Sequence, residues 1–272
     1  MAWTSPLMYE RLTWPEVRRA VEQDRVCLIP AGTLEDHGPH LPIDADTRIA
    51  GEICRRVAEE ALEDVVLLPP VIHGYTPHHM DFPGPITIGW ETFVKYCVDI
   101  GNSLAHHGSP RMLFLNGHGS NIPLIDMAAR LVSLENPDVL AAGAFYLTSR
   151  ESTRVIEEIR DSELGGMGHA CELETSIYLC IDPDGVSMDK AIDENSYPEG
   201  PNAWMDWSDG PLKLMPWWNA LSHTGVHGAP TKATAEKGRA LLDQAVKECA
   251  SFVRELRDKP LPVRWTPSET LP

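Results

Sequence analysis

The sequence predicts an α/β fold in which parallel strands are buried between layers of helices. Segments with helical spacing alternate with short apolar runs through most of the 272 residues. The strand candidates are continuous apolar runs, which is typical of parallel strands that are covered on both faces. At roughly 100–200 residues per domain, a chain of this length can form one large domain. We therefore expect a single domain over residues 1–272.

Strand and helix candidates alternate from about residue 25 onward. We expect strands where apolar residues follow one another without a break, at residues 25–32, 65–71, 111–115 and 139–146. We expect helices where apolar residues recur at helical spacing, at residues 47–62, 90–106, 122–134, 152–160, 169–180 and 231–256. Residues 182–230 are irregular and rich in tryptophan, and connections of that length are usually functional, so we interpret them as an insertion or a lid. A Pro-rich tail is expected at residues 258–272.

The composition disfavours several classes of function. The 23 basic and 40 acidic residues give a net charge of −17, so we expect neither a nucleic-acid partner nor an anionic membrane surface. No apolar run of roughly 18 residues predicts a membrane-spanning helix, and the first residues lack the pattern of a signal peptide. The six cysteines are widely spaced and form no CxxC pair. This spacing indicates reduced thiols and a cytoplasmic location.

A first polar cluster follows the first expected strand. Glu35 and His37 are two residues apart, so both side chains point the same way from an extended segment, and Asp46 follows within one loop. Ligands of open α/β sheets bind beyond the carboxyl ends of the strands. Carboxylates and imidazoles held together there can bind Zn²⁺, Mn²⁺ or a similar ion. The alternative interpretation is a charged surface loop whose aspartate caps the next helix.

A second cluster follows the third expected strand. His118 stands there between two glycines, which is not a natural place for a core histidine. Glycines permit tight turns and the close approach of another group. The alternative is a plain strand-to-helix turn in which Ser120 or Asn121 caps the helix. The loop that precedes the second expected helix adds Tyr75 and His79, whose side chains could line the same site.

A third cluster begins at His169, directly after a glycine-rich hinge. Glu172 and Glu174 follow near a helix N-terminus, where the helix dipole by itself favours acidic residues. A carboxylate that faces a buried cleft would instead need a metal or another cation. Together the clusters supply the Glu, Asp and His ligands of a two-metal hydrolytic site. The sequence holds no GxSxG, GxxxxGK[ST] or HExxH motif that would favour another mechanism.

The combined motifs resemble the creatininase (creatinine amidohydrolase) family. The family's opening motif is similar to residues 30–42 (PAGTLEDHGPHLP) followed by Asp46. Later segments match in the same order, at residues 79–84, 116–119, 169–176 and 225–238, so that the likeness spans about residues 5–257. The resemblance implies a three-layer α/β/α sandwich with a mostly parallel sheet. It also implies two divalent metal ions (Zn, Mn or Fe) per chain, a small-molecule substrate and a homohexamer.

The resemblance assigns a role to each matching residue. It implies that Glu35 and His37 bind opposite ions, that Asp46 bridges them, and that His118 is a further ligand. It also implies that His169 is catalytic and passes protons near the scissile bond.

The chain departs from creatininase proper directly after His118. Creatininase has an aromatic residue and then a glutamate ligand there, and this chain has Gly119 and Ser120. Because serine is a poor substitute for a carboxylate, the fifth ligand must come from elsewhere. We nominate Glu174, a carboxylate in a matching motif, as both ligand and catalytic residue, with Glu172 as the rival.

The substrate pocket is the part that the motifs define least. Creatininase carries a tryptophan shortly before the position of His169, and this chain has Gly-Gly-Met-Gly there, so creatinine is not the expected substrate. Tryptophans in 182–230 could form an aromatic wall, although core packing or an oligomer contact is the alternative. We expect these substrate-binding residues: His79, Tyr75, Gly119, Ser120, Trp204 and Trp207.

These observations favour a metal-dependent hydrolase. We expect it to attack a carbonyl of a small amide, cyclic amide or formamide through a metal-bridging water. One alternative is hydrolytic ring opening of a diketo-inositol or a related cyclic ketone, a C–C hydrolysis. A further alternative is a metal-binding scaffold without catalysis, which the replacement at Ser120 suggests and the other retained site residues oppose.

Overall fold

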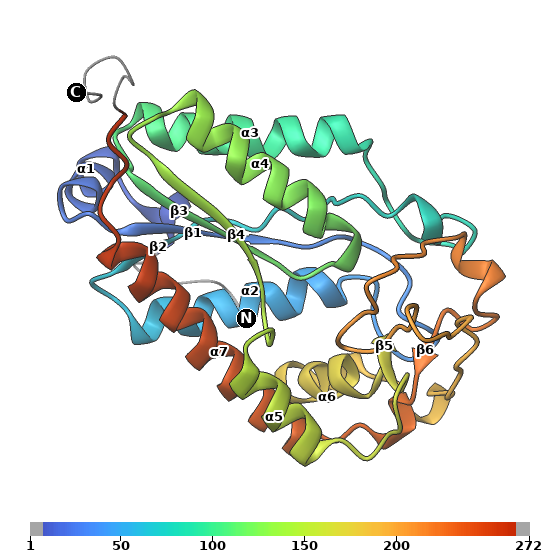
Figure 1. Ribbon diagram of the computed structural model, residues 1–272. Coiled ribbons are helices and arrows are strands. Elements are labelled where there is room, and N and C mark those ends of the chain that lie inside the picture. The colour runs from blue at the N-terminus through green and yellow to red at the C-terminus, as the bar shows by residue number, and fades with distance from the viewer. Residues whose placement is uncertain (1–7, 265–272) are drawn as a thin grey trace, which may run out of the picture.

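The centre of the molecule is a four-stranded parallel sheet. The computed structural model describes residues 8–264, and its main sheet has the strand order β2-β1-β3-β4 (Figure 1). The strands are β1 (Val26–Ala31), β2 (Val65–Leu67), β3 (Arg111–Asn116) and β4 (Leu140–Phe145). All four expected strands are confirmed. The second is shorter than expected because Pro69 and Pro70 follow it and have no N–H to donate to a neighbouring strand.

Helices cover both faces of this sheet, which confirms the three-layer α/β/α fold. Helices α3 (Trp90–His106) and α4 (Ile122–Glu135) cover one face. Helices α2 (Ala45–Glu60) and α7 (Ala235–Asp258) cover the other, and α5 (Arg150–Ile159) and α6 (Glu172–Ile181) extend that layer (Figure 1). None of the helices within residues 8–264 is long and apolar enough to cross a membrane.

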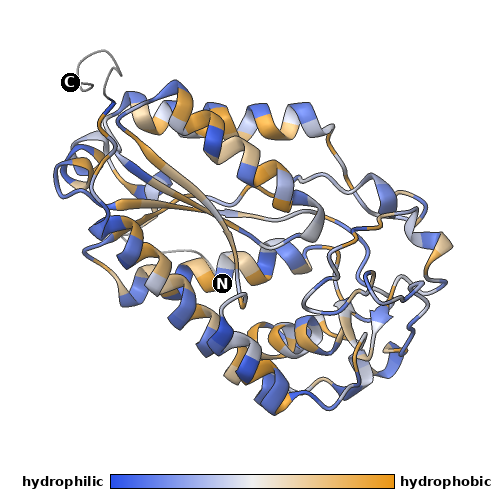
Figure 2. Ribbon diagram, in the orientation of Figure 1, coloured by the Kyte–Doolittle hydropathy of each residue, from blue (hydrophilic) through white to orange (hydrophobic). Residues whose placement is uncertain are grey.

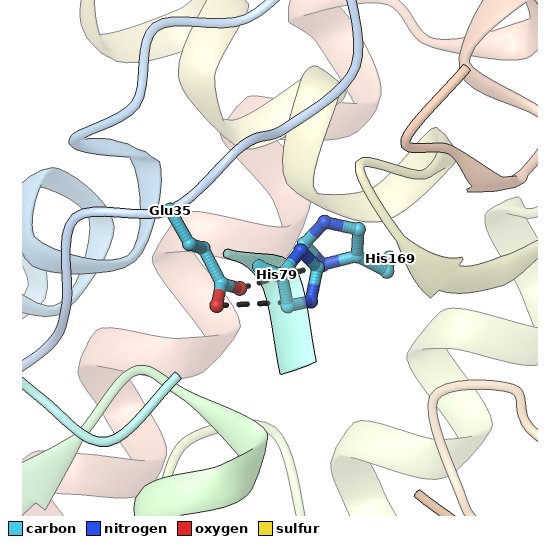
Figure 3. Close-up of side chains that lie close together, drawn as sticks. All are labelled: Glu35, His79 and His169. Carbon is cyan, nitrogen blue, oxygen red and sulfur yellow. Dashed lines mark ion pairs between the residues drawn. The ribbon is translucent and has the colours of Figure 1, made fainter. Parts of the chain in front are cut away.

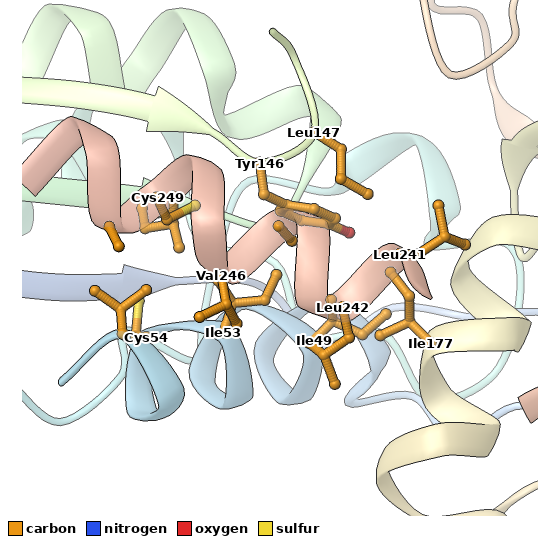
Figure 4. Packing of buried hydrophobic residues seen from close by; sticks show 14 of the residues in the cluster. Ile49, Ile53, Cys54, Tyr146, Leu147, Ile177, Leu241, Leu242, Val246 and Cys249 are labelled. Carbon is orange, nitrogen blue, oxygen red and sulfur yellow. The ribbon is translucent and has the colours of Figure 1, made fainter. Parts of the chain in front are cut away.

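The alternation of side chains along the strands divides the core into two parts. In β3, Met112 and Phe114 pack with α3 and α4, whereas Leu113 and Leu115 pack with α2 and α7. Apolar residues run along the strands and the inward sides of the helices (Figure 2). The larger core joins α2, α6 and α7 around the buried ring of Tyr146 (Figure 4). Both faces of the sheet are therefore dry, as continuous apolar strands require.

Apart from short 3₁₀ helices, one α-helix and two strands were not expected from the sequence. Helix α1 (Trp14–Glu22) begins with a capping box between Thr13 and Glu16 and has a proline in its first turn, so its start signal was present. Strands β5 (Met167–His169) and β6 (His227–Gly228) form a two-stranded antiparallel sheet. They are too short and glycine-rich for an apolar pattern to reveal them.

Residues 182–230 have little regular structure but possess a small core of their own, formed by Tyr197, Ala203, Met205, Trp218 and Leu221. This segment is tied to the main body through Asp206. Its carboxylate accepts hydrogen bonds from the Arg160 guanidinium and from the backbone N–H groups of Gly165 and Met167. The segment thereby holds β5, at whose end His169 lies. Helix α7 ends at Asp258, so the described part of the expected tail follows it without a helix.

Helices α6 and α7 are in unusually close contact. A Cβ atom at Gly238 in α7 would overlap the carbonyl oxygen of Ser176 in α6. Beside this contact, the buried carboxylate of Glu172 accepts hydrogen bonds from Lys237 Nζ (2.5 Å) and from the backbone N–H groups of Asp161 and Ser162 (2.9 Å each). Burial by itself would raise the pKa of Glu172, but Lys237 and these backbone donors lower it. The ion pair therefore joins the two helices.

We predict that Gly238→Ala destabilises the protein. Alanine is favoured over glycine inside a helix by about 1 kcal/mol, but the added methyl group would collide with Ser176 and force the helices apart, at a cost of about 1–3 kcal/mol or more. Urea unfolding of the variant, with the exposed neighbour Arg239→Ala as control, measures the difference. An unchanged or higher free energy of unfolding for Gly238→Ala would contradict the packing described above.

We predict that Lys237→Met lowers the free energy of unfolding near neutral pH by about 1–3 kcal/mol, because Glu172 loses its charged partner. The pKa of Glu172 is lowered in the folded state, so its contribution is present above its unfolded pKa and is lost as pH falls through the lowered folded value. The difference between the variant and the original protein should therefore shrink in acid. Denaturant titrations near neutral pH and in acid test this, with the exposed Lys247→Met as control.

Candidate metal centre

The polar clusters meet at the carboxyl edge of the sheet. Glu35 and His37 lie on the chain that leaves β1, and His118 lies on the chain that leaves the adjacent parallel strand β3. Asp46 is in the first turn of α2, His169 ends β5, and Glu174 is in the first turn of α6. Parallel neighbours end at the same edge of a sheet, so segments distant in the sequence converge there. All six side chains are buried, and we call these six residues the cluster.

The first group that could hold a metal ion consists of Glu35, Asp46 and His118. Nδ1 of His118 lies 3.2 Å from Glu35 Oε1 and 3.0 Å from Asp46 Oδ2. Its other nitrogen, Nε2, donates to the carbonyl oxygen of Tyr75 at 3.2 Å, which leaves Nδ1 as the nitrogen that can bind a cation. Burial alone would raise the pKa of Glu35, but the neighbouring His118 and His79 hold it well below its usual range.

The second group consists of His37, Glu174 and His169. Nε2 of His37 lies 3.2 Å from Asp46 Oδ1 and 4.0 Å from Glu174 Oε1. The two oxygens of Asp46 thus face different groups, Oδ1 toward His37 and Oδ2 toward His118, which is the arrangement of a bridging carboxylate. Burial would lower the pKa of His37, but the carboxylates of Asp46, Glu174 and Glu35 together raise it to about 10. Burial also raises the pKa of Glu174.

The third group consists of Glu35, His79 and His169 (Figure 3). Nε2 of His79 lies 3.8 Å from Glu35 Oε2, and Nδ1 of His169 lies 3.6 Å from Glu35 Oε1. Burial, together with the charge of the nearby His37, holds the pKa of His169 well below its usual range. Glu35 therefore belongs to both the first and the third group, and its Oε1 faces His118 as well as His169.

The donor set fits divalent cations. Among the described residues, the ion-pair partners of Glu35, Asp46 and Glu174 are histidines, and no lysine or arginine neutralises these buried carboxylates. Nε2 of His37 and Oδ2 of Asp46 are buried without a hydrogen-bond partner. Buried polar atoms in that state are costly unless they coordinate an ion. The mixture of imidazole nitrogens and carboxylate oxygens suits Zn, Mn or Fe.

The two candidate replacements for the missing carboxylate are separated by the structure. Glu174 lies within the cluster, whereas Glu172 forms an ion pair with Lys237 of α7. Oγ of Ser120 lies 3.4 Å from Nε2 of His78 and is not part of any of the three groups. A Cβ atom at Gly119 would meet nothing within 4 Å, so the space beside this residue is open.

The structure places the tryptophans differently from the expectation. Trp207 packs against Phe145 and Tyr146, and its Nε1 donates to the carbonyl oxygen of Leu147, so it belongs to the core. The indole N–H of Trp204 donates to Ser208 within its own loop. Neither contact reaches the cluster, so the expectation that they line the site finds no support in the geometry.

A different tryptophan covers the cluster. Trp218 stacks on His79 with ring centroids 4.7 Å apart at 24°, and it meets His169 edge-on at 4.9 Å. Sequence reasoning did not separate it from the other tryptophans of the same segment, because their local patterns are alike. Asp36, which accepts a hydrogen bond from His79, was also missed. It lies between Glu35 and His37, so the alternation of an extended segment predicts that its side chain points to the opposite side.

Comparison with known proteins agrees with this geometry. The family model described as creatinine amidohydrolase matches residues 10–253. A mycofactocin precursor peptide peptidase of Mycolicibacterium smegmatis is 32% identical over 249 residues, covering 88% of this chain and 85% of the relative. A 3-dehydro-scyllo-inosose hydrolase of Thermotoga maritima is 26% identical over 282 residues, covering 97% of this chain and 88% of the relative.

Solved structures of creatininase share the fold. A manganese form superposes with a TM-score of 0.82 at 26% identity, and a zinc–zinc form of a mutant gives 0.80 at 25%. Both cover 94% of this chain and 100% of the solved chain. The residues that carry the motifs, the buried ligand cluster and the match over nearly the whole chain lead to one conclusion: this protein belongs to the creatininase family.

Proposed function

We propose that the protein is a hydrolase with two metal ions that cleaves the C–N bond of a small amide, cyclic amide or formamide. The single observation that carries this proposal is the pair of ligand groups joined by Asp46, whose two oxygens face His118 and His37. Hydrolytic relatives in the same family support it. Two ions there would polarise a carbonyl group and make a water molecule more acidic.

The ligands divide into two sets that share one residue. Glu35, Asp46 and His118 would hold one ion, and His37, Asp46 and Glu174 would hold the other. Glu174 supplies the carboxylate that Ser120 lacks. Its second oxygen, Oε2, faces the backbone N–H of Cys171 at 3.4 Å, which orients the side chain from the start of α6.

His169 is the proposed proton-transfer residue. Its Nε2 donates to the backbone oxygen of Asp36 at 2.8 Å, so its Nδ1 faces the cluster. The ring therefore holds a nitrogen able to carry a proton at the place where a leaving group would depart. The open space beside Gly119 would admit the substrate, and Trp218 would form one wall around it. Tyr75 contributes its carbonyl oxygen, which orients His118.

A second reaction remains a candidate. The Thermotoga maritima relative is named for hydrolysis of an inosose, and it aligns with 97% of this chain. Such a reaction breaks a C–C bond of a cyclic ketone with the same attack at a carbonyl. From the family likeness we also propose a homohexamer, which light scattering would test. The six free cysteines support a cytoplasmic location.

We predict about two transition-metal ions per chain in protein purified without chelators or nickel. Glu174→Gln should lose about one of them because a neutral amide is a weaker ligand, whereas Glu172→Gln should keep both and lose only stability. Elemental analysis and circular dichroism of both variants measure this. Two ions retained in Glu174→Gln, or one ion lost in Glu172→Gln, would overturn the ligand assignment.

We predict that the metal-loaded protein adds one water molecule to members of an amide panel that contains formamides, cyclic amides and short peptides. A parallel panel of cyclic diketones tests the C–C alternative, and mass spectrometry reads both. Removal of the metal with a chelator should abolish turnover, and re-addition of Zn²⁺ or Mn²⁺ should restore it. Turnover of diketones alone would replace the proposed reaction with the alternative.

A further inference from the structure

One aspartate fixes two histidines of the site. Oδ1 of Asp36 accepts a hydrogen bond from Nδ1 of His79 at 2.6 Å. The backbone oxygen of the same residue accepts one from Nε2 of His169 at 2.8 Å. An ionised carboxylate and a carbonyl group can only accept, so the hydrogen atoms must lie on these two ring nitrogens.

Whenever either ring is neutral, its remaining nitrogen is an acceptor. These two atoms, Nε2 of His79 and Nδ1 of His169, lie 3.8 Å and 3.6 Å from the two oxygens of Glu35 (Figure 3). The two rings are 4.7 Å apart between centroids. The second nitrogens of two rings from different segments of the chain thus converge on one side of the cluster.

The surroundings hold this arrangement in place. Trp218 stacks on the ring of His79, and its Nε1 donates to the carbonyl oxygen of Gly225 at 2.9 Å. Gly225 has a φ of +84°, and a Cβ atom there would overlap Oδ2 of Asp36. The glycine thus provides both a left-handed conformation and room for the carboxylate.

The Asp36 carboxylate is not explained by stability. It is buried, its Oδ2 has no hydrogen-bond partner, and its described ion-pair partner is His79. An unsatisfied buried acceptor costs about 1–3 kcal/mol. Asp–His pairs in which the carboxylate holds Nδ1–H and leaves Nε2 free are the arrangement that orients a histidine for proton transfer in other hydrolases.

We propose that His79, oriented by Asp36, is a second proton-transfer residue beside His169. The proposal rests on the hydrolase function given above. In amide hydrolysis one proton leaves the attacking water as its oxygen bonds to the carbonyl carbon, and one joins the nitrogen as the C–N bond breaks. Nε2 of His79 accepts the first proton, which passes to the adjacent His169 ring and from there to the leaving nitrogen. Asp36 is a positioning residue because it acts only through the rings.

Variants of Asp36 and His79 test the proposal by kinetics. His79→Gln should lower kcat by about 10²–10⁴, and Asp36→Ala should lower it by about 10–100-fold, both with KM changed only a few-fold. Asp36→Asn should not restore the activity, because its amide N–H₂ can donate to Nδ1 and thereby select the other tautomer of His79. The matched control is Asp81→Ala, which removes an exposed acid two residues from His79 and should leave kcat unchanged.

A second measurement does not depend on activity. Solid-state ¹⁵N spectra of histidine-labelled protein should show Nδ1–H and a bare Nε2 at His79, assigned by difference from His79→Gln. In Asp36→Ala the His79 signals should change to a mixture of tautomers, while the His169 signals stay, because their partner is the backbone. Unchanged His79 signals in Asp36→Ala, or full kcat in either Asp36→Ala or His79→Gln, would overturn the proposal.

Metal content separates this inference from the proposed function. The variants at Asp36 and His79 should keep the metal content of the original protein. Loss of an ion in His79→Gln would make His79 a ligand and overturn its role in proton transfer. An original protein that hydrolyses no amide despite a full metal content would instead count against the proposed function, and the ¹⁵N spectra would still decide the orientation by Asp36.

Discussion

The packing of two strand-exit loops against the first turn of α2 is the constraint on which the site depends. A Cβ atom at Gly117 would lie 2.5 Å from the backbone oxygen of Asp46, and one at Gly32 would lie 2.6 Å from Cα of Thr47. Glycine at both places lets β1 and β3 deliver their loops directly onto this turn. In this packing the carboxylate of Asp46 lies between His118 and His37.

This close approach concentrates negative charge in a dry place. Glu35, Asp46 and Glu174 are buried together, and the groups that face them are imidazoles, whose charge depends on protonation. A fold assembled for stability alone would place lysine or arginine opposite such carboxylates, as it does at Glu172 with Lys237 and at Asp206 with Arg160. The contrast between these pairs and the cluster favours cation binding by the cluster.

The segment over residues 182–230 supports the site in two ways. Through Asp206 it fixes the backbone of Gly165 and Met167, and hence the strand that ends at His169. Through Trp218 it covers the rings of His79 and His169. The same segment thus positions one wall of the cluster and packs against two histidine rings at the site.

The sequence by itself determined the order of the main-sheet strands and of the helices that cover them, and it singled out Glu35, His37, Asp46, His118, His169 and Glu174. These features are local patterns that can be recognised without knowledge of the fold. They include continuous apolar strands, a glycine-flanked histidine and the spacing of Glu35, His37 and Asp46. Only the tertiary structure separates Glu174 from Glu172 by position, because these neighbours on one helix differ in what faces them: His37 in one case and Lys237 in the other. It likewise places Trp218 against the rings of His79 and His169, and it brings the carboxylate of Asp36 to His79. Contacts between residues tens of positions apart depend on how the layers pack, and no periodicity along the chain encodes them.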